Sequence, residues 1–365
     1  MADNGFTQMS HKRNGIEALR IHRWFIAAAL TAVMGLWFGG CAGQAQAPAA
    51  RPEIFWPNPP AVKRIEFVKA VSTPADLNIR PGIWKRLMHY VVGKDAAAIV
   101  SPYGIASDSR GRLYVVDTFL RRVHVFDGSG SRYDYFPEDG PALASPIGIA
   151  IDHTGRVYVS DSKKGVVYIF RDHGRKFLSV MGGDILKRPT GIAIDPQTDE
   201  LLVVDTLQSR VFRFDRSSRS VKGSFGTDGT AAGRFHYPTN ICVTGTGDIV
   251  VSDALNFRIQ VFSPRGRFRF AFGRMGRSPG TFSRPKGVAA DSDGNIYVVD
   301  ALFDNVQVFD KRGRLLMAFG DHGTGYGSFW LPTGLYIDEQ DLIYVSDSSN
   351  RRVQIFRYLK EDKSK

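Results

Sequence analysis

The chain has 365 residues, 43% of them hydrophobic, and its 48 Lys and Arg against 36 Asp and Glu give a formal net charge of +12. Only two cysteines are present, which excludes a small scaffold held by several disulfides. About 300 residues follow the N-terminal segments described below, enough for one sizeable hydrophobic core.

The N-terminus has the layout of an export signal. Basic residues up to Arg23 precede a run from Trp24 to Gly40 that contains no charged side chain. We expect residues 1–40 to be a signal peptide. The rest of the chain would then be exported and lie outside the cytoplasm.

Cys41 directly follows this apolar run. The stretch from Phe38 to Cys41, FGGC, resembles a bacterial lipobox, in which small residues precede the cysteine that receives a lipid. Phe38 departs from that motif, where leucine is usual. We expect lipidation at Cys41 and a location in the cell envelope, on the periplasmic side of a bacterial membrane. The alternative is an uncleaved anchor, although the run is near the lower length limit for a spanning helix.

Three segments separate Cys41 from the repeats. Residues 41–60 are rich in Ala, Pro and Gln, which indicates an extended tether. Residues 61–71, AVKRIEFVKAV, are rich in strand-forming residues and belong to no repeat. Residues 81–93 have apolar side chains at helical spacing, so we expect a short helix there. This helix would either cover one end of the domain or lie on lipid beside the anchor.

The remaining chain consists of six copies of one unit. Each copy has an apolar strand that ends in Asp, and a Phe follows nine residues later, with a period of 44 to 48 residues. In the fifth copy, residues 285–320, turn sequences divide the chain into four short runs of strand-forming residues. A four-stranded sheet of this kind is apolar on both faces and is buried by radial stacking. The sequence therefore predicts an all-β, six-bladed β-propeller with blades from residue 101.

Closure of the ring is also predicted. The last copy ends after three strands and runs into the charged tail YLKEDKSK. We expect residues 61–71 to pair with this copy as a latch strand, because an open ring would leave two unpaired edges. The propeller domain would then span residues 61–360.

A fixed phrase recurs in the copies: P-x-G-[IV]-A-x-D, then G-x-[IL]-Y-V-[VS]-D, then R-V-x-[VI]-F, with connections such as AGRFHYP, PGTFSRP and YGSFWLP. This phrase resembles the NHL repeat of six-bladed propellers over roughly Ser101 to Phe356. The fourth copy departs from it, because Asn240 replaces a Gly and Thr244 replaces an Asp. We expect its inner strand to turn differently.

The Asp that closes each strand invites a metal or acid–base interpretation. In four copies, however, an Arg follows five residues later, within reach across a hairpin, so the simplest role is a structural ion pair. The predicted pairs are Asp117 with Arg122, Asp205 with Arg210, Asp253 with Arg258, and Asp347 with Arg352. Asp161 and Asp300 lack this Arg and would be the first candidates if a cation binds.

Whether the chain could be an enzyme can be examined at the residues that follow the proline at the start of each repeat, the blade-opening proline. The resemblance extends to an amidating lyase in which His residues at this position hold zinc. Here the positions hold Tyr103, Ile147, Thr190, Thr239, Lys286 and Thr333. No nucleophile elbow is expected either, because the G-x-S-x-G spacing at residues 276–280 lies in a connection between two repeats and not between a strand and a helix. We expect a non-catalytic module with no metal and no cofactor, and the alternative is a lyase or hydrolase with its site at the axial mouth.

The turns after the Asp residues carry unusual apolar bulk. Because successive strands run antiparallel, these turns lie at the same end of the ring as the blade-opening residues. The candidate binding residues at this end are Tyr103, Phe119, Lys163, Leu207, Leu255, Lys286, Leu302 and Phe303. Their apolar members either pack between blades or form a protein-binding face.

The basic charge indicates an anionic partner. For an exported protein we expect an envelope protein or an anionic glycan or lipid, and no nucleic acid, with the ring itself monomeric. Two alternatives remain open: the charge serves solubility alone, or the ring is a purely structural spacer.

Overall fold

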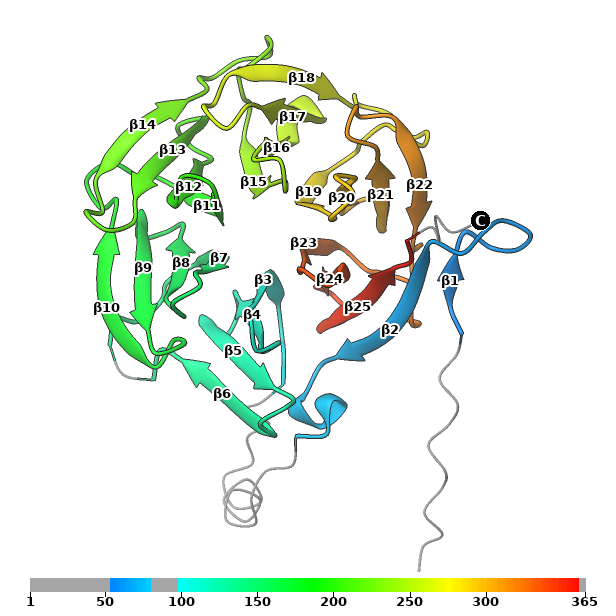
Figure 1. Ribbon diagram of the computed structural model, residues 1–365, viewed down its shortest axis with the longest axis horizontal. Helices are drawn as coiled ribbons and strands as arrows, with labels where there is room; N and C mark the ends of the chain where they lie inside the picture. Colours follow the sequence, from blue (N-terminus) through cyan, green and yellow to red (C-terminus); the bar gives the residue numbers. More distant parts are fainter. Residues whose placement is uncertain (1–52, 80–97, 139, 361–365) are drawn as a thin grey trace, which may run out of the picture. The chain divides into compact units, whose positions relative to one another are not determined.

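The computed structural model describes residues 53–79, 98–138 and 140–360. These residues form six β-sheets arranged around a central axis (Figure 1). The expected signal peptide, Cys41 and the expected helix at 81–93 lie outside the described residues. Within the described ranges, no helix is long and apolar enough to cross a membrane.

Five sheets have four antiparallel strands each, in sequence order from the axis outward. Blade one contains β3 (Pro102–Ser107), β4 (Leu113–Asp117), β5 (Arg122–Asp127) and β6 (Arg132–Phe136). Blade two contains β7 (Pro146–Ile151), β8 (Val157–Asp161), β9 (Val166–Arg171) and β10 (Lys176–Met181). Blade three contains β11 (Pro189–Ile194), β12 (Glu200–Asp205), β13 (Arg210–Asp215) and β14 (Val221–Phe225). Blade four contains β15 (Pro238–Val243), β16 (Ile249–Asp253), β17 (Arg258–Phe262) and β18 (Phe268–Phe272). Blade five contains β19 (Pro285–Ala290), β20 (Ile296–Asp300), β21 (Asn305–Phe309) and β22 (Leu315–Phe319). Two short 3-10 helices, η1 (Pro74–Leu77) and η2 (Ala254–Asn256), complete these elements.

The sixth blade combines both ends of the described chain. Its strands are β23 (Pro332–Ile337), β24 (Leu342–Asp347), β25 (Arg352–Tyr358), β2 (Ile65–Val71) and β1 (Phe55–Trp56). β2 runs antiparallel to β25, with Phe67 opposite Phe356. β1 lies within the segment predicted as an extended tether. It is held because the Trp56 ring packs 5.6 Å from Phe319 and 5.8 Å from Phe356.

The core lies between adjacent blades. Every residue of β4, β8, β12, β16 and β20 is buried, because neighbouring blades cover both faces of these strands. One cluster, for example, packs Val116 and Val123 of blade one against Val159 and Phe170 of blade two. This arrangement explains why the strands are apolar throughout rather than alternating.

The inner strands approach one another closely at a single glycine position. A Cβ at Gly148 would collide with the carbonyl oxygen of Thr190 in the next blade, and a Cβ at Gly334 would collide with that of Tyr103. Blade four has Asn240 at this position. Its register also differs, since Asn240 pairs with Ser252, whereas the other blades skip this pairing.

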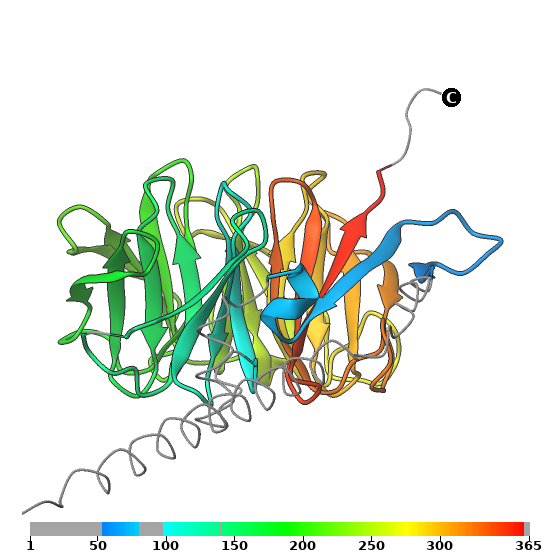
Figure 2. The same ribbon diagram turned by 90° about the horizontal axis from the view of Figure 1, so that it is seen from below.

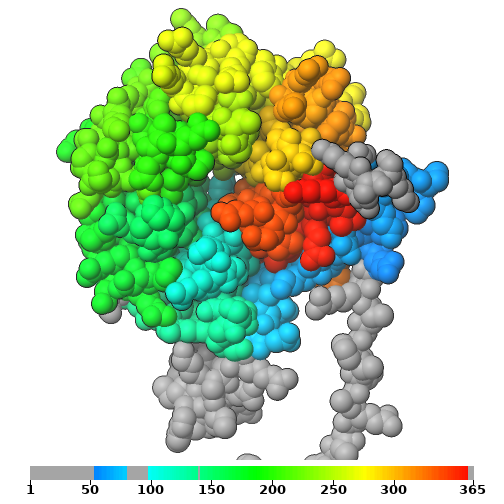
Figure 3. Space-filling model, in the orientation of Figure 1, coloured from blue at the N-terminus to red at the C-terminus, as the bar shows by residue number. Residues whose placement is uncertain are grey.

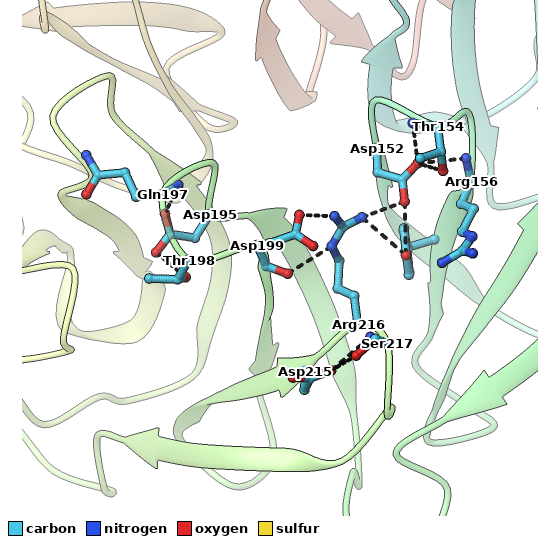
Figure 4. A network of polar contacts seen from close by, with 11 residues as sticks. Asp152, Thr154, Arg156, Asp195, Gln197, Thr198, Asp199, Asp215, Arg216 and Ser217 are labelled. Atoms are coloured by element: carbon cyan, nitrogen blue, oxygen red, sulfur yellow. Dashed lines mark hydrogen bonds and ion pairs between the residues drawn. The ribbon is translucent and has the colours of Figure 1, made fainter.

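Blades two and three are joined by a buried charge network (Figure 4). Arg216 follows β13 directly and donates to Asp152 of blade two at 2.5 Å and to the Tyr158 hydroxyl at 3.3 Å. It also pairs with Asp199 of its own blade. The Arg216 side chain is only 5% exposed, so these contacts replace most of its hydration.

Candidate binding face and axial mouth

Strand pairing brings two kinds of loop to one end of the ring, which Figure 2 shows from the side. In blade four, Asp253 at the end of β16 lies opposite Pro238 at the start of β15 and Arg258 at the start of β17. We call this end the tip face. It comprises the two residues before each blade-opening proline and the six hairpin tips at 118–121, 162–165, 206–209, 254–257, 301–304 and 348–351.

The strand-ending Asp residues organise the tip face through backbone hydrogen bonds. Asp161 accepts from the amides of Ala144 at 2.6 Å and Ser145 at 3.1 Å, in the segment before its inner strand. It also accepts from Lys163 and Lys164 in its own hairpin tip. Each carboxylate therefore ties a tip to a segment about one strand pair earlier.

The same pattern corrects the sequence-based view of Asp161 and Asp300 as the less constrained carboxylates. Asp300 accepts backbone hydrogen bonds from Ser283 at 2.7 Å and Leu302 at 3.1 Å, among others. Although neither carboxylate has an Arg partner, neither is free to bind a cation. Backbone amides that the fold brings close donate to their oxygens.

Two of the four predicted Asp–Arg ion pairs occur among the described contacts. Arg258 Nε lies 2.8 Å from Asp253, and Arg352 Nε lies 2.8 Å from Asp347. Both carboxylates are fully buried. Burial raises the pKa of Asp253 despite hydrogen bonds from His236, Asn256 and Arg258.

At the other two predicted pairs a different side chain reaches the carboxylate. His124 Nε2 lies 3.4 Å from Asp117, while the Arg122 guanidinium sits 4.6 Å from the centre of a tyrosine ring. Gln208 Nε2 donates to Asp205 at 3.0 Å, and no ion pair to Arg210, opposite it in the strand pairing, occurs among the described contacts. Burial, opposed by the bond to Asp117, lowers the pKa of His124. Sequence reasoning missed both positions, although they recur: Gln260 and Gln354 donate from the place of His124, and Asn256 and Asn350 donate from the place of Gln208.

Four hairpin tips carry large apolar side chains into solvent. Phe119 is 71% exposed, Leu207 61%, Leu255 48% and Leu302 53%. Phe303 is half-buried. The residues before the inner strands add Tyr237, Trp330 and Leu331. The tip face thus holds seven of the sixteen large hydrophobic side chains that are exposed in the described chain.

The exposed charges at the positions of the tip face are basic, although an exposed acid lies directly beside it: Asp228 Oδ1 is 3.5 Å from Nδ1 of His236. Its exposed basic residues are Arg121, Lys163, Lys164, Lys187, Arg188, Arg284 and Arg351. At the same positions of the described tips and connections, no Asp or Glu is exposed; Asp304, the one acidic residue there, is 8% exposed.

At the centre of the tip face lies the axial mouth. Lys286 Nζ lies 5.7 Å from the centre of the Tyr103 ring, although the two residues belong to blades five and one. The structure therefore brings these two predicted site residues together at the mouth. The hairpin-tip candidates Phe119, Lys163 and Leu302 each come from a different blade.

A cavity of about 250 Å³ lies along the axis, lined by the inner strands of all six blades. Figure 3 shows the hollow from one face of the ring. The lining is mainly glycine and aliphatic, with Ser107, Asn240, Cys242 and Tyr336 among the few side chains with polar atoms. Burial raises the pKa of the Cys242 thiol to about 12. Among the described residues, no cluster of three or more His, Cys, Asp or Glu could hold a metal ion.

Comparison with known proteins assigns the repeat. Residues 235–262, 282–309 and 329–356, in blades four to six, match the family model described as NHL repeat. An 88-residue part of the chain is 35% identical to the E3 ubiquitin-protein ligase NHLRC1 of Homo sapiens. That match covers 24% of this chain and 22% of the ligase, so the chain spans about a fifth of this relative.

Solved structures with the same architecture have diverse descriptions. Virginiamycin B lyase from Staphylococcus aureus has a TM-score of 0.54 at 13% identity, over 71% of this chain and 96% of the lyase. An auxiliary nutrient binding protein from Bacteroides thetaiotaomicron has a TM-score of 0.57 at 14% identity, over 73% of this chain and 71% of that chain. At such identities the likeness concerns the fold alone. The chain therefore contains NHL repeats, and its fold is a six-bladed β-propeller.

Proposed function

We propose that this propeller is a non-catalytic platform that binds an acidic protein through its tip face. The observation that carries the proposal is the coincidence, on this face, of exposed apolar side chains with an excess of exposed basic residues. Exposed apolar groups that cluster rather than scatter mark interaction surfaces. Basic residues beside them favour a partner whose own surface is acidic.

The residue types fit a protein partner better than a glycan or lipid. Phe119, Tyr237 and Trp330 are large, exposed aromatic side chains of the kind that anchor protein interfaces. Phe119 stands on a hairpin tip, and Tyr237 and Trp330 stand on the connections before the inner strands. Buried carboxylates hold the backbone of both kinds of segment, so little conformational entropy is lost on binding. The name of the human relative, a ubiquitin-protein ligase, likewise describes a protein that acts on proteins.

We further propose that the platform is exported and lipid-anchored at Cys41 in the cell envelope, so that its partner is an envelope protein. The support is the basic and apolar N-terminal sequence and the FGGC stretch. Cys41→Ser should leave a longer precursor and abolish labelling with a radioactive fatty acid. An unchanged mass and unchanged labelling would overturn the anchor.

The latch is part of the same proposal. β2 supplies the strand that the last repeat lacks, and its pairing with β25 supports a role in closing the ring. A closed ring holds the six tips at fixed spacing, which a rigid binding face requires.

The central experiment is cross-linking of the full chain in the intact envelope, followed by affinity measurement with the captured protein. Phe119→Ala and Leu302→Ala should each weaken binding by about 1 to 2 kcal/mol, roughly five- to thirtyfold. Phe177→Ala is the matched control, because Phe177 is also exposed but lies on the outer strand β10. Equal binding by all three folded variants would refute the tip face as the interface.

The alternative is a lyase or hydrolase with its active site at the axial mouth. The axial cavity favours it as a place for a small substrate. Metal analysis of the purified full chain and turnover assays on lactone substrates test it. Saturable turnover that is lost when the mouth residue Lys286 is changed to Met would replace the binding proposal.

A further inference from the structure

Three neighbouring side chains of blade four each have a buried polar atom without a hydrogen-bond partner within the described part of the chain. These atoms are Thr239 Oγ1, Asn240 Nδ2 and Ser252 Oγ. Thr239 and Asn240 are consecutive, and Asn240 lies opposite Ser252 in the strand pairing. We call these three residues the polar corner, and it adjoins the axial cavity, which Asn240 lines. Each unpaired buried group costs on the order of 1 to 3 kcal/mol, so the cluster requires a physical explanation.

Comparison with equivalent positions shows why Ser252 has no partner. In blade two, Ser160 Oγ donates to the carbonyl of Thr190 in the next blade at 2.5 Å. In blade six, Ser346 Oγ does the same to the next blade's inner strand at 2.8 Å. Both blades have a Gly, Gly148 or Gly334, at the inner-strand position where the next blade comes closest, whereas blade four has Asn240 there. A Cβ at Gly148 would collide with the Thr190 carbonyl that Ser160 binds, so we infer that the Cβ of Asn240 keeps the equivalent carbonyl of blade five out of that place.

The Thr239 hydroxyl lacks a hydrogen-bond partner for a separate reason. The equivalent Thr190 lies 2.8 Å from the Thr206 hydroxyl in the same blade. Thr333 of blade six lies 2.7 Å from the hydroxyl of its own tip serine. In blade four that tip position is Ala254, which has no hydroxyl. Two independent substitutions therefore leave unpaired groups at the same corner.

The one charged side chain at the six blade-opening positions stands in the adjacent blade. It is Lys286, whose ammonium lies 5.7 Å from the centre of the Tyr103 ring of blade one. A side-chain amide, two hydroxyls and an ammonium can all donate hydrogen bonds, and charge-assisted bonds to a carboxylate are the strongest of this kind. No Asp or Glu occupies a blade-opening position.

We propose that the polar corner, together with Lys286, binds a carboxylate group at the axial mouth. Two sources share this chemistry: an acidic side chain of a protein bound to the tip face, or a free small carboxylic acid. The first source rests on the proposed function. The site itself does not, because a small carboxylate can be titrated without any protein partner.

The test is calorimetric titration of the full chain, in buffer without carboxylates, using succinate and its neutral isostere succinamide. A capped peptide with one Asp, and the same peptide with Asn, form the second arm. Succinate or the Asp peptide should bind saturably, at least about tenfold more tightly than its neutral counterpart. Binding of the peptide alone identifies a protein as the source of the carboxylate, and equal binding of succinate identifies a free acid.

Asn240→Gly is the decisive variant, because it restores the residue that the other five blades have. It should let the inner strands close and Ser252 bond to the next blade, so the fold is kept while carboxylate binding falls at least about tenfold. Lys286→Met should weaken binding similarly. Arg265→Ala, a loss of charge in an exposed turn outside the tip face, is the matched control and should bind normally.

Two results would overturn the site. One is the absence of any saturable difference between the carboxylates and their neutral isosteres, which would mean that only water occupies the corner. The other is undiminished binding by folded Asn240→Gly. Failure of the tip-face variants to reduce capture of a protein partner would leave the carboxylate site intact, so the two proposals fail separately.

Discussion

A buried carboxylate at the end of the second strand carries much of the local order in each blade. Asp117 accepts hydrogen bonds from the amides of Val100, Ser101, Phe119 and Leu120. Burial by itself would raise its pKa, but the bonds from His124 and these amides outweigh that effect and hold the pKa at about 2. The ionised form is therefore the one that the fold stabilises.

We expect Asp117→Asn to lower the free energy of unfolding by about 2 to 4 kcal/mol at pH 7. An amide has one acceptor oxygen and would turn its NH₂ group toward donors of the same kind. Urea unfolding measures the change. Asp134→Asn is the control, because Asp134 pairs with Arg132 at the surface, and its effect should stay within about 0.5 kcal/mol.

The same carboxylate predicts a pH dependence. Its pKa is lower in the fold than the ordinary value of 3.8, so its contribution is complete above that value and is lost as the pH falls toward about 2. Urea titrations between pH 6 and 2, values chosen to bracket this window, should show a shallower loss of stability in Asp117→Asn than in the native chain. Parallel curves would mean that other groups govern acid unfolding.

At the scale of the element, the strands could be predicted because six copies repeat one spacing. Each turn sequence and each strand-ending Asp then occurs six times at the same spacing, so the strand boundaries are supported by six copies. The partners of those Asp residues could not be predicted, because the amides that bind Asp161 lie 16 and 17 residues earlier and meet it only in the folded blade. β1 was missed for a similar reason: two residues carry no periodicity, and Trp56 is fixed by rings distant in sequence.

The candidate site was predictable in its position and less so in its detail. Topology alone places Phe119 and Leu207 at one end of the ring, but sequence cannot distinguish exposed tips from side chains packed between blades. The polar corner was visible only as the departure at Asn240. That Thr239 and Ser252 are left unpaired there follows from the spacing between two inner strands, which a single sequence does not contain.

The interface between blades two and three supports a sharper prediction. Arg216→Ala should destabilise the chain by about 3 to 5 kcal/mol, because it leaves the buried Asp152 carboxylate without its cation. Arg219→Ala, in the same turn but exposed, is the matched control and should change little. Thermal unfolding of both variants measures the difference, and similar melting temperatures would show that the buried pair contributes no net stability.

The latch can be tested at the level of one side chain. Phe67 of β2 is buried against Phe356 and stacks on Tyr326. Phe67→Ala should cost about 3 to 5 kcal/mol, and deletion of residues 61–71 should also promote aggregation by exposing strand edges. Val62→Ala, at a 70% exposed position of the same segment, should be neutral. If the deletion melts at the native temperature, another segment closes the ring.

For the molecule as a whole, the two ends of the propeller differ in what surrounds their basic charge. The turns at the far end also carry exposed cations, including Arg265, Arg267 and Arg312. Exposed aspartates stand beside some of them, and Arg314 is paired with Asp310 at 2.7 Å. The tip face combines its cations with clustered exposed apolar side chains, and an exposed acid, Asp228, lies beside it at His236. Charge alone would therefore attract an anionic partner to either end, whereas we expect specific docking at the tip face, where apolar side chains accompany the charge.

This difference predicts the outcome of a matched pair of charge reversals. Lys163→Glu with Lys164→Glu changes the tip face by the same four units of charge as Arg265→Glu with Arg267→Glu changes the far end. If the partner docks on the tip face, the first pair should slow association at low salt by about tenfold or more and repel the partner locally. The second pair should change association only slightly, through the net charge, and this small effect should vanish at about 0.5 M salt because exposed charges are then strongly screened. Stopped-flow mixing with the purified partner, once cross-linking has identified it, measures the association rates of both pairs of variants. Equal slowing by the two pairs would show that net charge alone attracts the partner, and a larger effect of the second pair would move the interface to the opposite end of the ring.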